Sequence, residues 1–101
     1  MFAIIRKYRT TQAALITQRV NEGFLSVISH SPGFIAYYGI DTGNGEWASF
    51  SIFETEEQAN QSTADAAAWV KENVASLMDG PPEVTAGRLV VRKEPGTLGA
   101  G

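Results

Sequence analysis

The sequence contains no cysteine, and its 101 residues include one histidine, His30. The lack of cysteine excludes disulfides, thiol nucleophiles and thiolate metal sites. A single histidine also excludes a multi-histidine metal site within one chain, so we expect no metal. Positive charge is scarce as well, because eight Lys and Arg stand against eleven Asp and Glu, and the net charge is −3. Nucleic acids and anionic membranes select basic surfaces, so neither is an expected partner.

Long apolar runs are also missing. No run approaches the roughly 18 residues that a membrane span needs. The apolar start of the chain is too short for a signal peptide, because Arg6 and Lys7 end it. We therefore expect a cytoplasmic protein. The composition, 44% hydrophobic and 19% charged, is that of an ordinary globular domain. We expect one domain over residues 1–93 and a flexible tail over 94–101, which has little to bury.

Six segments carry secondary-structure patterns. Period-two alternation with β-branched and aromatic residues predicts strands over 2–9, 34–41, 46–54 and 83–93. Apolar residues at helical spacing predict helices over 11–29 and 55–78. A Gly-Asn-Gly run at 43–45 predicts a hairpin turn between the two middle strands. Thr55 and Gln58 form a candidate capping box at the start of the second helix.

The order β-α-β-β-α-β is that of an α+β, ferredoxin-like fold. Right-handed crossovers place both helices on one face of a four-stranded antiparallel sheet. The other face stays bare, and we expect it to carry apolar side chains from the first, third and last strands. Because large apolar patches rarely persist on monomers, the pattern predicts a homodimer that pairs through its sheet faces.

One side of the strand 46–54 is unusual. It presents Trp47, Ser49, Ser51 and Phe53 in alternation. Two buried hydroxyls need hydrogen-bond partners, so this side is poorly suited to a dense core. It fits either the floor of a partly wet pocket or an exposed edge, and the sequence favours neither.

Aromatic residues are numerous for a small domain. They indicate a pocket for a flat apolar ligand that tyrosine hydroxyls would orient. The alternative is that they pack in the core and the dimer interface. The candidate substrate-binding residues are Tyr8, Tyr37, Tyr38, Trp47, Ser51, Phe53 and Trp69.

Ionisable candidates are few. His30 is the natural general base, since its unperturbed pKa lies near neutrality. The alternative is an exposed histidine near a helix C-terminus, where positive charge is favourable. Arg6 and Arg88 lie within strands, so either could reach a pocket or cross a dimer interface. Their alternative is a salt bridge with a nearby glutamate.

Several segments together resemble a known family. The segments 5–9, 32–34, 49–54, 69–73 and 81–87 are similar in order and spacing to the antibiotic-biosynthesis-monooxygenase-like group of the dimeric α+β barrel superfamily. The resemblance covers residues 2–93. It implies a homodimer with a pocket in each subunit, between the sheet and the two helices.

The resemblance also implies a range of chemistry. Members oxidise polycyclic phenols or quinols with dioxygen and no cofactor, while others open haem or act as isomerases. The oxygenases hold the substrate oxygen with an asparagine and a tryptophan, at positions that fall on Ser49 and Phe53 here. The haem-opening branch has an axial histidine on the second helix, where this chain has Ser62 and Thr63.

Three functions follow as hypotheses. The first is a cofactor-independent monooxygenase or isomerase that acts on a small aromatic or polyketide-type substrate, with His30 and Ser49 as catalytic residues. The second is a non-catalytic dimer that binds a small aromatic ligand in the same pocket. The third is a structural dimer whose own aromatic residues fill the pocket. A cavity of several hundred Å³ beside Trp47 and Ser49 would exclude the third.

Overall fold

The computed structural model describes residues 1–95, so positions 96–101 of the expected tail lie outside the described residues. The elements follow the expected order β-α-β-β-α-β. The strands are β1 (Phe2–Arg9), β2 (Phe34–Asp41), β3 (Glu46–Phe53) and β4 (Glu83–Arg88). The helical segments are α1 (Ala13–Arg19), a π-helical turn (Val20–Phe24), α2 (Leu25–Ser29), α3 (Glu56–Asn73) and a 3₁₀ turn (Ala75–Leu77).

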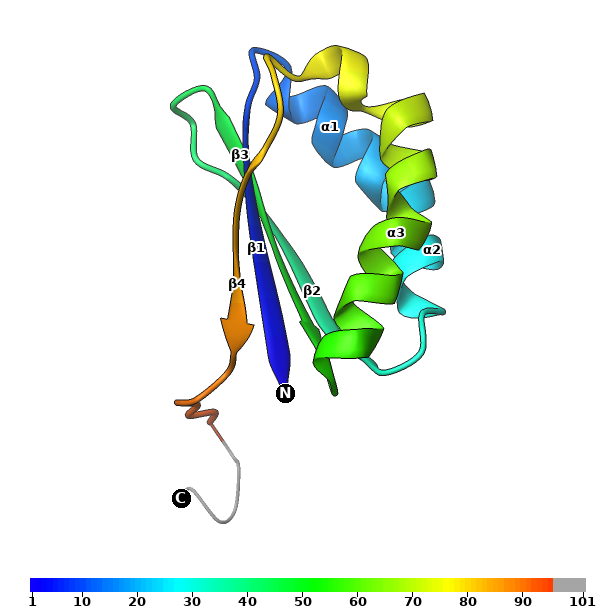
Figure 1. Ribbon diagram of the computed structural model, residues 1–101. Coiled ribbons are helices and arrows are strands. Elements are labelled where there is room, and N and C mark those ends of the chain that lie inside the picture. Colours follow the sequence, from blue (N-terminus) through cyan, green and yellow to red (C-terminus); the bar gives the residue numbers. More distant parts are fainter. Residues whose placement is uncertain (96–101) are drawn as a thin grey trace.

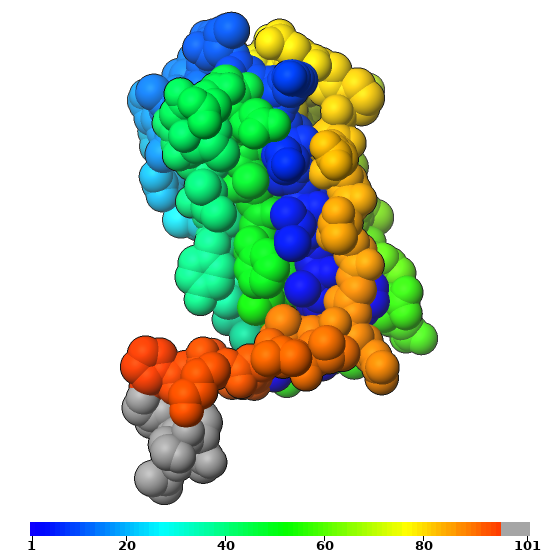
Figure 2. Space-filling view, turned by 90° about the vertical axis from the view of Figure 1, so that its left-hand side faces the viewer, coloured from blue at the N-terminus to red at the C-terminus, as the bar shows by residue number. Residues whose placement is uncertain are grey.

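The four strands form one antiparallel sheet in the order β2-β3-β1-β4. The helices α1, α2 and α3 all lie against the same face of this sheet (Figure 1). On the opposite face the strands lie side by side at the surface, and no described helix covers them (Figure 2). The predicted α+β, ferredoxin-like fold is therefore confirmed. None of the helices in residues 1–95 is long and apolar enough to cross a membrane.

The helical segment predicted as one helix over 11–29 is interrupted by the π-helical turn. Gly23 lies in this turn, and a Cβ atom placed there would lie 3.1 Å from the indole Nε1 of Trp69. The absence of a side chain at Gly23 thus lets α3 approach closely through Trp69. The buried residues of the three segments, which face the sheet, are Ile16, Val20, Phe24 and Ile28.

The helix predicted over 55–78 ends earlier, at Asn73. The chain after it is held by the connection between β1 and α1, because Thr10 donates its hydroxyl hydrogen to the Leu77 carbonyl at 2.6 Å. At its other end Thr55 accepts a hydrogen bond from the Gln58 amide at 3.2 Å, as predicted. The return bond of the capping box is not made, since Gln58 Oε1 has no hydrogen-bond partner. The Gln58 side chain lies instead beside Gly33.

The last strand, predicted over 83–93, ends at Arg88. Arg88 pairs with Phe2, the first residue of β1, so no partner strand remains beyond this point. Leu89 makes one further backbone hydrogen bond, from its amide to the Met1 carbonyl at 2.9 Å. The length of β4 is thus set by the length of its neighbour β1.

The open face of the sheet is apolar, as predicted. The prediction that the last strand, β4, contributes apolar side chains to this face is wrong. Strand register places Val84 of β4 on the helix side, with Arg6, whereas Glu83 and Thr85 lie on the open face. In place of β4, the edge strand β2 contributes, with Tyr38 and Ile40. The apolar residues of this open face are Ala3, Ile5, Ala36, Tyr38, Ile40, Ala48, Phe50 and Ile52.

Candidate functional site

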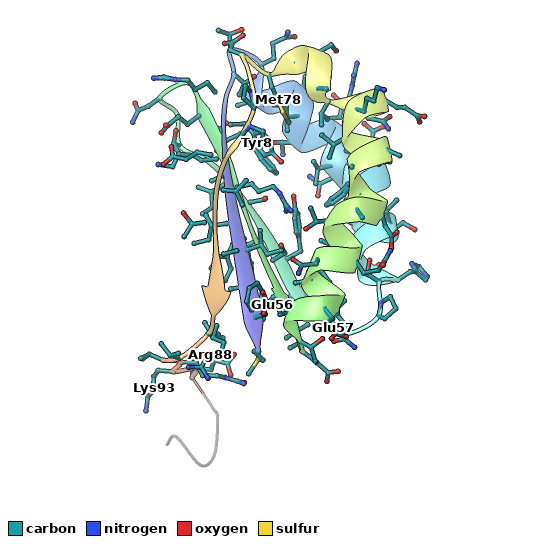
Figure 3. The ribbon with its side chains drawn as sticks, viewed as in Figure 1. Tyr8, Glu56, Glu57, Met78, Arg88 and Lys93 are labelled. Atoms are coloured by element: carbon teal, nitrogen blue, oxygen red, sulfur yellow. The ribbon has the colours of Figure 1, made fainter. Side chains whose placement is uncertain are left out.

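A cavity of about 290 Å³ lies between the helix-covered face of the sheet and the helices. Its walls come from β1, β2, β3, the segment from α1 through the π-helical turn to α2, and α3. Pro81 and Pro82, which precede β4, also line it. Tyr8 points from β1 into this space, on the side of Met78 (Figure 3). The aromatic residues of the chain do not fill this space, which argues against the hypothesis of a self-filled pocket.

Strand β3 forms the floor of the cavity with its helix-facing side. Trp47 and Ser49 are each 4% exposed, and Ser51 and Phe53 are each 1% exposed. This side is therefore buried and borders the cavity, and the alternative of an exposed edge is wrong. The two serines are small, so they leave the volume above them open. Ser51 Oγ lies 3.4 Å from the Ile4 carbonyl, a long hydrogen bond.

Trp47 is held in place from two sides. Its indole Nε1 donates to the Thr17 hydroxyl at 2.9 Å, and that hydroxyl donates in turn to the Ala13 carbonyl at 2.9 Å. On the β2 side the ring lies on Gly39, where an added Cβ atom would come within 2.7 Å of Trp47 Cζ2. The indole is therefore a fixed wall of the cavity.

Phe24 joins two of the predicted aromatic residues into a second wall. Its ring centroid lies 5.3 Å from that of Tyr37, with an interplanar angle of 61°, and 5.1 Å from that of Trp69. These are edge-to-face and tilted contacts, the arrangements that aromatic rings prefer. The wall runs from β2 through the π-helical turn to α3.

Polar groups gather on the same side of the sheet. Arg6 extends from β1 and donates from Nη2 to the Thr63 hydroxyl on α3 at 2.6 Å. Burial raises the pKa of Tyr37 far above its ordinary value, and nearby Tyr8 raises it further. A hydrogen bond from Ser49 and the charge of Arg6 act in the opposite direction, to lower that pKa.

Tyr8 behaves in the same way. Burial raises the pKa of its hydroxyl, and the positive charge of Arg6 opposes this effect. Both tyrosines are therefore neutral at physiological pH, and each keeps a hydroxyl hydrogen that it can donate. The site thus combines a guanidinium with two neutral phenols, a set that is suited to holding an oxygen atom of a ligand.

Most predicted binding residues line the cavity: Tyr8, Tyr37, Trp47, Ser49, Ser51, Phe53 and Trp69. Tyr38 does not. It is 58% exposed on the open face, and its ring centroid lies 6.4 Å from that of Phe50. His30 does not line the cavity either. It is the exposed residue that follows the last residue of α2, with Nδ1 2.6 Å from the Ser26 carbonyl oxygen.

The sequence-based list of site residues left out two side chains that are central to the cavity, Arg6 and Phe24. Arg6 lines the cavity, which was one of the three possibilities considered for it, whereas Arg88 lies at the opposite end of the sheet from Tyr8 (Figure 3). The signal for Arg6 was its place between Ile4 and Tyr8 on one side of β1. Phe24 was assigned to a helix face without a role. Within residues 1–95, no group of three or more His, Asp or Glu could hold a metal ion.

Solved structures resemble the whole described fold. A protein of unknown function from Nitrosomonas europaea, NE2512, matches with a TM-score of 0.77 and 21% identity over 93% of each chain. The ActVA-Orf6 monooxygenase of Streptomyces coelicolor, solved with the ligand Nanaomycin D, matches with a TM-score of 0.73 and 19% identity, over 93% of this chain and 91% of that one. The fold is that of the antibiotic biosynthesis monooxygenases.

A third similar structure is SnoaB, a cofactor-independent oxygenase of Streptomyces nogalater. It matches with a TM-score of 0.71 and 9% identity, over 94% of this chain and 96% of that one. No protein-family model matches the sequence, and no curated protein matches it. The structural likeness confirms the resemblance to the antibiotic biosynthesis monooxygenases at the level of the fold.

Proposed function

We propose that this chain is a cofactor-independent monooxygenase that binds a small aromatic or polyketide-type molecule in the cavity. The observation that carries the proposal is the open volume of about 290 Å³ between fixed aromatic walls, with hydroxyl and guanidinium donors on one side. Sites for small ligands commonly combine a mostly apolar cavity with a few placed polar groups. The ligand and activity named for the two Streptomyces proteins agree with this assignment.

Each part of the site has a role in this proposal. Trp47 and Phe24 hold the rings of the substrate between them. Tyr37, oriented by Ser49, donates a hydrogen bond to the substrate oxygen. Arg6 stabilises negative charge on that oxygen. The substrate binds as its anion, with its hydroxyl proton released to bulk water, because the cavity lining holds no general base. An electron-rich anion of this kind reacts directly with dioxygen. Electrostatic stabilisation of this type is the main contribution that a protein without a cofactor makes to such a step.

The reaction balances without any added reductant. For a hydroxynaphthalene substrate, one atom of dioxygen becomes a ring carbonyl oxygen and the other leaves as water. The substrate supplies all four electrons and both hydrogens of the water, and it becomes a naphthoquinone. The residues of the site bind the substrate and stabilise its anion, and none of them is oxidised.

Oxygen uptake tests this proposal. We expect the protein to consume dioxygen with 1-naphthol or 1-hydroxy-2-naphthoate and to place one ¹⁸O atom from ¹⁸O₂ in the quinone product. Ser49→Ala should slow turnover about tenfold or more, the usual scale for one lost positioning hydrogen bond. Ser29→Ala, an exposed serine outside the cavity, is the matched control. No uptake above that of buffer with either compound would contradict the proposed activity.

A specific observation favours the second function, a protein that binds the ligand without turnover. The residues that line the cavity include no Asp, Glu, His or Lys, so the site holds no ordinary general base. Binding of an aromatic compound without oxygen uptake would support this alternative.

We also propose that two copies pair through the open face defined above. Tyr38 is 58% exposed and Ile40 is 52% exposed, and with Ile5 and Phe50 they form one continuous apolar surface. A two-fold contact between two such faces would remove both from water. Light scattering should give twice the mass of one chain at micromolar concentration, and the mass of a single chain would contradict the pairing.

A further inference from the structure

We infer that the ligand of this cavity brings its own negative charge, and is an aromatic acid that is already ionised in water. Its anionic oxygens bind Arg6, and its rings lie among the aromatic side chains. The inference rests on the proposed function only in taking the cavity as the ligand site. It adds the chemical class of the ligand: an aromatic carboxylate, or an enol of similar acidity.

The first observation is that Arg6 has no counter-ion. It is the one charged residue that lines the cavity. Within residues 1–95, no carboxylate lies within ion-pair distance of its guanidinium, and its hydrogen bond goes to the neutral Thr63 hydroxyl. A guanidinium has five N–H donors in a planar fork, and one N–H···O bond leaves most of them available. That fork matches the two oxygens of a carboxylate.

The second observation is that the cavity does not supply a base. A weakly acidic phenol is mostly neutral in water at neutral pH, and no group of the cavity lining can take its proton, so only its small ionised fraction could pair with Arg6 as an anion. The tyrosine hydroxyls are not such groups, because burial raises the pKa of Tyr8 and of Tyr37, and both keep their protons. An acid that is ionised before it binds is not limited in this way. The neutral tyrosines then act as additional donors to its oxygens.

The third observation is the placement of the charge. Arg6 is half-buried and Thr63 is exposed, so their contact lies at the edge of the cavity. The floor below it is nearly sealed from solvent, since Ser51 and Phe53 of β3 are each 1% exposed. An amphipathic ligand fits this gradient, with its rings inward and its anionic group at the wet edge, where the cost of desolvating the charge is smallest.

Isothermal titration with matched probes tests the inference. At neutral pH, 2-naphthoate is an anion and 2-naphthol is a neutral molecule with the same rings. We expect the protein to bind 2-naphthoate about tenfold more tightly or better, the scale of a charge-assisted hydrogen bond. Arg6→Met should abolish this preference. Lys71→Met removes the same charge from the exposed side of α3 and should preserve it.

A third probe separates the two kinds of acid. The enol 2-hydroxy-1,4-naphthoquinone is ionised at neutral pH but offers no carboxylate. Tighter binding of this compound than of 2-naphthoate identifies the enol as the preferred anion, and the reverse order identifies the carboxylate. If Arg6→Met does not fold, as judged by circular dichroism, Arg6→Lys replaces it. That variant keeps the charge but loses the fork, so the preference should shrink without vanishing.

Equal binding of 2-naphthoate and 2-naphthol would overturn the inference, as would the absence of binding by every probe. An unchanged preference in Arg6→Met would overturn it as well. These results are independent of oxygenation, because the heat of binding is measured without turnover. An anion preference without oxygen uptake would contradict the proposed activity alone, and oxygen uptake without an anion preference would contradict this inference alone.

Discussion

The two sides of strand β3 differ in a way that ordinary sheets do not. The side under the helices carries Trp47 and two serines and borders a hollow, although each of these residues is at most 4% exposed. The side without helices carries Phe50 and Ile52, which are half-buried and lie opposite residues of the neighbouring strands. A sheet normally places its more aliphatic side against the helices. Here the side under the helices borders a cavity, and the side without helices exposes apolar side chains.

We propose that the two sides meet different partners. A hollow with fixed walls and hydroxyl groups suits a small molecule, because a ligand can fill the volume and satisfy the donors. A continuous apolar surface suits another protein surface, because only a large partner removes it from water. Variants on each side can break this comparison separately.

The largest effect is expected on the open face. Phe50→Glu places a charge at the centre of the proposed contact between two copies, where burial of an unpaired carboxylate costs several kcal/mol. We expect the mass measured by light scattering to fall from two chains to one. Ala64→Glu adds the same charge on the exposed surface of α3 and should leave the mass unchanged. A Phe50→Glu variant that remains a dimer would contradict the assignment of this face.

The next effect concerns the hollow itself. Ala66 lies on α3, is half-buried and lines the cavity. Ala66→Phe should place a ring in the open volume and weaken binding of an aromatic ligand by at least about tenfold, because the ligand would lose its contact area. Ala68→Phe, on the exposed surface of α3, is the control. Undiminished binding in Ala66→Phe, measured by titration calorimetry, would show that the ligand site lies elsewhere.

A smaller effect is expected at the wall formed by Trp47. Gly39→Ala would bring a methyl group within 2.7 Å of the indole, so the ring must move. We expect the free energy of unfolding to fall by about 1–3 kcal/mol, the usual cost of overpacking. Gly87→Ala is the matched control in a strand, since nothing lies within 4 Å of its added carbon. Equal stabilities of the two variants in urea unfolding would contradict the fixed position of Trp47.

The smallest effect is a dependence on alkaline pH. The pKa of Tyr37 is raised in the folded protein, so above about pH 10 the unfolded chain loses a proton that the folded chain keeps. The free energy of unfolding therefore falls as pH rises, by up to about 1.4 kcal/mol per pH unit for each such group. Tyr37→Phe removes one such contribution. Urea unfolding between about pH 9 and pH 11 should show a shallower decline than in the wild type, and equal slopes would contradict the burial of this hydroxyl.

The alternation of side chains along the strands predicted from the sequence which residues share one side of the sheet, and this includes much of the candidate site. Trp47, Ser49, Ser51 and Phe53 are two residues apart, and a strand places such residues on one side. The same rule placed Arg6 with Ile4 and Tyr8. What alternation alone does not give is which side the helices cover. That choice follows from the direction of the crossovers and the register of all four strands.

Strand β2 departs from simple alternation of side chains. Phe34 and Tyr37 are three residues apart, yet both pair with residues of the helix-facing side of β3. A shift in register between Phe34 and Ala36 makes this possible, because an extra residue exchanges the two sides of a strand. Nothing in the local composition signals the shift. The sequence alone therefore could not distinguish Tyr37 from Tyr38 as a cavity residue. In the structure Tyr37 lines the cavity and Tyr38 lies on the open face.

The limits of several elements, and the position of His30 relative to the cavity, depend on how distant segments pack together. The π-helical turn lies where Gly23 meets Trp69, 46 positions further along the sequence. Strand β4 ends where β1 begins. His30 was considered for its chemistry alone, and its distance from the cavity follows from the place where α2 ends. Residue chemistry names candidates, but the packing of helix against sheet decides which of them share a space.

The most direct test of the assignment of the two sides is an amide and indole NMR titration. The chain has two tryptophans, Trp47 and Trp69, and both line the cavity. With saturating 2-naphthoate we expect both indole N–H signals to shift, together with the amide of Ser49, while the amides of Tyr38 and Ile40 stay in place. Shifts confined to Tyr38 and Ile40, with both indole signals unmoved, would contradict the central claim that the helix-covered side is the ligand site.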